Sequence, residues 1–146
     1  MNKNYYIATI VFIAILVQSR LIVHPWNFTP VIAAGVFAGF YFRQFFLASF
    51  LIILSMFIGD LYIGFHNTML FTYIGLGLAV AIGMLIKSFK FLEILITGLV
   101  SSLAFFLITN FGAWMTLEMY DKNIAGLISS YVLAIPFFHN TLISTL

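Results

Sequence analysis

The chain has no cysteine, and its 146 residues include only four acidic and six basic side chains. Without cysteine it can form no disulfide, no thiolate metal site and no cysteine nucleophile. Charged residues make up 7% of the sequence, against about 25% in an ordinary soluble domain. Ten charged side chains cannot cover a water-soluble surface, so the composition excludes an ordinary soluble protein.

Several functional motifs are also missing. The sequence contains no glycine-rich nucleotide loop ending in Gly-Lys-Ser/Thr, no Gly-x-Ser-x-Gly and no His-Glu-x-x-His. No nucleophile and base are paired in a recognisable way, so the sequence does not predict an enzyme. No cofactor is predicted. The basic residues are scattered singly, which argues against nucleic-acid binding.

What the sequence does have is long apolar runs, because 64% of its residues are hydrophobic. These runs predict a single-domain, all-α integral membrane protein (residues 1–146) with six transmembrane helices. The expected segments are 5–23, 30–42, 45–65, 68–86, 91 to between 110 and 115, and 124–146. The second segment crosses the bilayer only if it extends past Arg43 or if its neighbours thin the membrane. Pro136 lies inside the last segment and is expected to kink it rather than end it.

The basic residues predict the orientation. A cytoplasmic N-terminus places four of them inside and two outside, which satisfies the positive-inside rule and puts both termini in the cytoplasm. The inner set is Lys3, Arg43, Lys87 and Lys90, and the outer set is Arg20 and Lys122. Arg20, near the end of the first segment, is expected to snorkel to the interface.

Asp60 lies near the end of a membrane-length segment. A carboxylate at the centre of a spanning helix costs about 2.5–3.5 kcal/mol, so a partner, water or ligand should offset it. Three roles are open: a metal or cation site with His24 and His66, contact with an organic ligand, or a hydrogen bond to a neighbouring helix or to the cap of the next segment. Because the spacing fits no metal motif, no metal is assigned.

The predicted orientation gathers polar and aromatic residues at the outer face, and these form a candidate binding site for a small molecule. The aromatic members could instead form an interfacial belt. The candidate site consists of His24, Trp26, Asn27, Asp60, Tyr62, His66, Asn67, Asn110, Trp114 and Tyr131.

Small residues recur every four positions in the second and fourth segments. Ala34 and Ala38, and likewise Gly75, Ala79 and Gly83, form stripes that permit close helix packing. The stripes predict packing within the chain, with docking to another membrane protein as the alternative.

Four blocks of sequence resemble the signatures of an uncharacterised family of small bacterial membrane proteins. They are residues 24–30, 60–70, 109–114 and 136–141. The size, the six-span plan and the polar outer cap are also similar to the S components, the substrate-binding subunits of energy-coupling factor transporters. That second resemblance implies an S-component-like bundle in the bacterial inner membrane, and a separate membrane coupling protein with ATPases. The Ala-x-x-x-Ala docking motif of many S components is absent from the first segment.

The leading hypothesis is therefore a membrane-embedded, substrate-binding component for uptake of a small, vitamin-like organic nutrient, with its site at the outer face. The alternative is a structural or assembly factor of the cell envelope that transports nothing, with the small-residue stripes as its partner surface.

Overall fold

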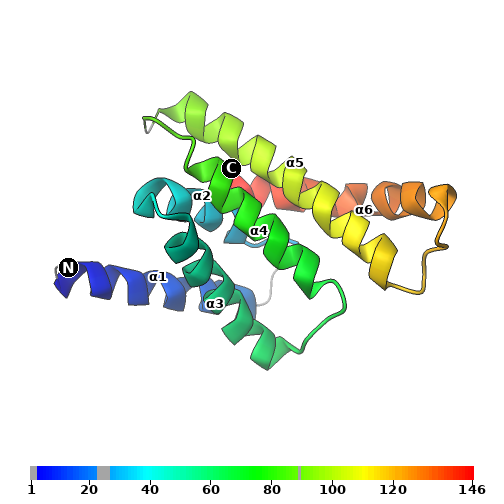
Figure 1. Ribbon diagram of the computed structural model, residues 1–146, viewed down its shortest axis with the longest axis horizontal. Helices are drawn as coiled ribbons and strands as arrows, with labels where there is room; N and C mark the ends of the chain where they lie inside the picture. The colour runs from blue at the N-terminus through cyan, green and yellow to red at the C-terminus, as the bar shows by residue number, and fades with distance from the viewer. Residues whose placement is uncertain (1–2, 23–26, 89) are drawn as a thin grey trace.

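The computed structural model describes residues 3–22, 27–88 and 90–146, with residues 3–8 as backbone only. Within these ranges the chain forms six α-helices and no strand (Figure 1). They are α1 Lys3–Leu21, α2 Val31–Phe42, α3 Phe45–Ile63, α4 Met69–Gly83, α5 Phe91–Thr116 and α6 Ile124–Thr145. All six lie where the apolar runs predicted them, and α6 continues through Pro136 as expected. By length and composition, α3, α5 and α6 could each cross a membrane.

The short helix α2 lies at the centre of the fold and packs against α3, α4, α5 and α6. Its 12 residues span about 18 Å at 1.5 Å per residue, well short of a bilayer core of about 30 Å. It does not extend past Arg43, which adopts a left-handed conformation (φ 54°) and donates its backbone N–H to Gly39. The extension considered for the second segment is therefore wrong.

Glycines bring α2 and α4 into backbone contact. A Cβ on Gly39 would collide with the carbonyl oxygen of Val80, and a Cβ on Gly83 with that of Val36. Ala79 is 1% exposed. The stripes therefore pack within the chain, as predicted, and cannot serve as a docking face for another protein.

Helices α2 and α4 run parallel and end together. The Arg43 guanidinium donates to the carbonyl oxygens of Met84 and Ile86, just past the end of α4. One to two turns before these ends, Gly35 of α2 lies beside Ala79 of α4. Because α2 is three residues shorter than α4 and the two helices end together, α2 begins about one turn after the start of α4, and the non-helical residues 27–30 precede it.

From α2 onward, the connections between helices lie at two opposite ends of the molecule. Figure 1 shows the N-terminus and the α2–α3 and α4–α5 connections toward the left, and the α3–α4 and α5–α6 connections toward the right. At the left end, Glu93 accepts hydrogen bonds from the backbone N–H groups of Lys87 and Ser88. At the right end, Lys122 donates to the carbonyls of Trp114 and Leu117 and caps α5. Charged side chains therefore tie down helix ends at both poles.

Candidate functional site

Asp60 is buried in α3 and is paired within the protein. Its Oδ1 lies 2.7 Å from Nη2 of Arg20 in α1, and its Oδ2 accepts a 2.7 Å hydrogen bond from the Tyr73 hydroxyl in α4. Arg20 also donates to the Met56 carbonyl at 2.7 Å. Gly59 permits this approach, because a Cβ there would lie 2.7 Å from Nη1 of Arg20. The cost of burying the carboxylate is thus offset by a partner, and the expected snorkelling of Arg20 is wrong.

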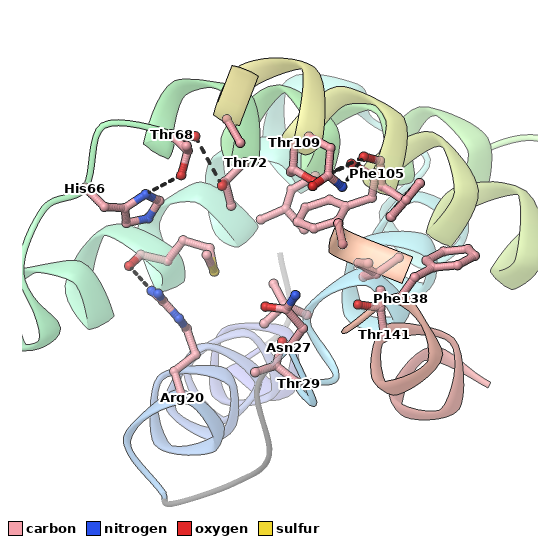
Figure 2. A pocket seen from close by; sticks show the side chains of 18 of the residues that line it. Arg20, Asn27, Thr29, His66, Thr68, Thr72, Phe105, Thr109, Phe138 and Thr141 are labelled. Atoms are coloured by element: carbon pink, nitrogen blue, oxygen red, sulfur yellow. Dashed lines mark hydrogen bonds between the residues drawn. The ribbon is translucent and has the colours of Figure 1, made fainter. Parts of the chain in front are cut away.

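Next to this ion pair, a cavity of about 690 Å³ lies among residues from all six helices (Figure 2). Its walls are largely apolar and include Met56, Leu76, Phe105, Phe106 and Phe138. The polar lining residues are Arg20, Asn27, Thr29, His66, Thr68, Thr72, Thr109, Asn110 and Thr141.

Polar residues face the cavity from several sides. Figure 2 shows Thr72 and Thr109 on one side and Asn27 and Thr29 opposite them. Asn27 has a left-handed backbone (φ 59°), a conformation that asparagine adopts more readily than most residues. The segment 27–30 then leads into α2, whose start at Pro30 has no side-chain cap. Two residues of this non-helical segment, Asn27 and Thr29, therefore line the cavity.

Most of the lining hydroxyls and amides bond to their own helix. Thr109 donates to the Phe105 carbonyl at 2.8 Å, and Asn110 donates through Nδ2 to the Phe106 carbonyl at 2.8 Å. Thr72 and Thr141 likewise donate to the carbonyls four residues before them. The protons of Thr72, Thr109 and Thr141 are used in this way, which leaves their oxygen lone pairs to accept hydrogen bonds.

The structure brings three of the predicted binding residues to the cavity: Asn27, His66 and Asn110. His66 bonds through Nδ1 to the Thr68 hydroxyl at 2.9 Å. Asp60 lies behind Arg20 and is 1% exposed, so the carboxylate itself is not part of the lining. His24 and Trp26 fall outside the described residues.

Four other predicted residues do not line the cavity. Tyr62 is 80% exposed, and Asn67 is also exposed. Trp114 packs on Phe111 and donates from Nε1 to the Asp121 carbonyl at 2.9 Å. Tyr131 donates its hydroxyl proton to the Leu107 carbonyl at 3.0 Å. Trp114 and Tyr131 thus hold α5 to the segments that follow it.

The other roles considered for Asp60 can be compared with its surroundings. Its hydrogen bond to Tyr73 on a neighbouring helix agrees with a structural role. Thr68 occupies the N-cap position of α4 but makes no side-chain capping bond. Among the described residues, no three histidine, cysteine or acidic side chains gather as metal ligands, and the proposed ligand His24 lies outside them.

Sequence reasoning missed Arg20 and the threonines. Thr68 and Thr72 are four apart, as are Phe105 and Thr109, and such spacing places each pair on one helix face. That signal was present but was hidden within strongly apolar runs. Residues of all four sequence blocks line the cavity: Asn27 and Thr29, His66 and Thr68, Thr109 and Asn110, and Phe138 and Thr141.

The chain belongs to the family of unknown function DUF6580, whose sequence profile matches residues 1–146. Comparison with curated proteins and with solved structures found no significant match. The likeness to S components of energy-coupling factor transporters therefore stays a prediction from size and architecture.

Proposed function

We propose that this member of DUF6580 is an integral membrane protein that captures a small organic molecule in the cavity between its six helices. The observation that carries the proposal is that residues of four separate sequence blocks line one cavity of about 690 Å³. Pockets for small molecules have volumes of about 300–1,000 Å³, with apolar walls and a few convergent polar groups. This cavity has the same character.

The backbone gives a second, independent reason. Non-helical backbone at membrane depth is tolerated where it is buried in protein or lines a water-filled cavity, because its N–H and C=O groups need partners. Residues 27–30 are non-helical and lead into α2, which begins about one turn after the start of α4, and Asn27 and Thr29 line the cavity.

The proposed setting is the bacterial inner membrane, with both termini in the cytoplasm. Three helices have the length and composition of spans, and the basic residues favour this orientation. The connection containing Arg43 and the one containing Lys87 and Lys90 then face the cytoplasm. The part of the cavity lined by His66, an exposed residue, then faces outward.

Reporter fusions test this topology. A fusion after Lys90 should report a cytoplasmic position and a fusion after Lys122 an external one, because α5 separates the two sites. Alkaline phosphatase and a fluorescent protein that folds only in the cytoplasm give opposite readouts at each site. The reverse pattern would place the part of the cavity lined by His66 on the cytoplasmic side and contradict the proposed uptake.

Capture alone needs no energy source, whereas inward release against a gradient does. The sequence has no nucleotide loop, so the uptake function includes a separate membrane coupling protein with ATPases. The stripe of Gly75, Ala79 and Gly83 is buried between helices and cannot be the coupling surface. The same burial removes the surface on which the envelope-assembly alternative depended.

Recovery of a bound molecule tests capture directly. Protein purified in mild detergent is denatured, and the released small molecules are identified by mass spectrometry. Asn110→Ala should lower the recovered amount about tenfold, since one lost hydrogen bond to the ligand is worth about 1.4 kcal/mol.

The matched control is Asn67→Ala, which removes the same amide from a residue outside the cavity lining. It should leave recovery unchanged. Equal recovery from wild type and Asn110→Ala, with both proteins folded, would mean that the cavity is not the site.

A further inference from the structure

The charges around the cavity are already balanced. Among the described residues that line the cavity, Arg20 is the only one with a lysine, arginine, aspartate or glutamate side chain. Its guanidinium pairs with Asp60 at 2.7 Å and donates to the Met56 carbonyl. A charged ligand would therefore lose its hydration without gaining an uncompensated counter-charge, and that desolvation is costly.

The hydrogen-bonding groups on three helices are oriented alike. Thr72 in α4, Thr109 in α5 and Thr141 in α6 all donate their protons to carbonyls of their own helices. Asn110 uses one Nδ2 proton in the same way, which leaves its Oδ1 as an acceptor and its second Nδ2 proton as a donor. This wall therefore presents mainly acceptors, and it favours a ligand that brings donors.

Aromatic rings border the same wall. Phe106 and Phe138 lie with their ring centroids 4.6 Å apart, and Phe105 lies beside Gly75, where α4 and α5 meet. Phe105, Phe106 and Phe138 all line the cavity. They offer apolar surface of the kind that a flat ring covers well.

We infer that the captured molecule is uncharged, carries hydroxyl or N–H donors toward Thr72, Thr109 and Asn110, and lays an apolar ring against Phe105, Phe106 and Phe138. This inference rests on the proposed capture function and narrows the class of its ligand. It separates neutral ring compounds from their phosphorylated or carboxylated relatives.

The test uses a defined equimolar mixture of three matched pairs, each with one uncharged and one anionic member. The pairs are nicotinamide with nicotinate, pyridoxine with pyridoxine 5′-phosphate, and riboflavin with riboflavin 5′-phosphate. The full-length protein in mild detergent is incubated with the mixture and separated by gel filtration. Retained compounds are then quantified by mass spectrometry. In at least one pair the neutral member should be retained roughly tenfold more than its anion.

Two isosteric variants connect retention to the acceptor wall. Thr109→Val removes a lining oxygen and should lower retention of the neutral compound about tenfold. Thr116→Val removes a hydroxyl from the same helix that makes the same kind of bond, to the Gly112 carbonyl, but lies outside the lining. The Thr116→Val variant should retain as much of the neutral compound as wild type does.

The outcomes separate this inference from the capture function. If wild type retains an anion preferentially and Thr109→Val lowers that retention, the cavity is still the binding site, but the inference of an uncharged ligand is wrong. Equal retention of every compound by wild type, Thr109→Val and Thr116→Val would count against both.

Discussion

Gly83→Ala should abolish stable folding, although it adds only one methyl group. The new Cβ would meet the carbonyl oxygen, carbonyl carbon and Cα of Val36, all of them backbone atoms of α2. Neither helix can relieve this contact by turning a side chain, so the two helices must move apart. Overpacking of a tight core costs about 1–3 kcal/mol and occasionally more, and a backbone clash falls at the upper end of that range.

The effect should spread because α2 packs against four other helices. Moving α2 displaces its first residues, Val31 and Ile32, which are 5% and 4% exposed and line the cavity. The variant should yield little monodisperse protein in mild detergent. Any folded fraction should unfold at a clearly lower temperature than wild type.

Gly77→Ala is the matched control on the same helix. A Cβ on Gly77 meets nothing within 4 Å, and alanine is favoured over glycine in a helix by about 1 kcal/mol. This variant should be as stable as wild type or slightly more stable. If Gly83→Ala matched Gly77→Ala in yield and unfolding temperature, the close α2–α4 contact would be wrong.

The helix positions could be predicted from the sequence because long apolar runs are separated by clear breaks. Arg43 and Gln44 end one run, and residues 116–123 end another. Each helix therefore begins and ends within a few residues of its expected position. The family match over residues 1–146 also agrees with the resemblance drawn from the four blocks.

The partners of Asp60 could not be predicted in the same way. Tyr62 is close in sequence and was expected to share a site with Asp60, but residues two apart in a helix do not face each other. Tyr62 is 80% exposed, and Tyr73 on α4 makes the hydrogen bond instead. How α1, α3 and α4 are rotated about their axes decides this pairing, and that depends on packing across the whole bundle.

Arg20→Met should destabilise the protein by about 3–5 kcal/mol, the range for removing one partner of a buried ion pair. Methionine keeps much of the unbranched stem of arginine but removes the guanidinium. The Asp60 side chain is 0% exposed, so its carboxylate would be left with the Tyr73 hydroxyl alone. Unfolding of the purified variant in mild detergent, followed by heat or denaturant, measures the loss.

Asp60→Asn in the same chain should restore most of that stability. The amide is neutral and nearly isosteric, so it costs less to bury than an unpaired carboxylate. Its oxygen can still accept the hydrogen bond from Tyr73. The double variant Arg20→Met/Asp60→Asn should therefore be more stable than Arg20→Met alone, and the two changes should be non-additive by about 2 kcal/mol.

Strictly additive effects would contradict the ion pair, because independent sites show no coupling energy. The cycle also separates the two roles of Arg20, which both neutralises Asp60 and lines the cavity. If charge balance is its main contribution, the double variant regains stability and still retains a neutral ring compound. If Arg20 holds the ligand directly, stability returns but retention does not, and the ligand then carries a group that a guanidinium recognises.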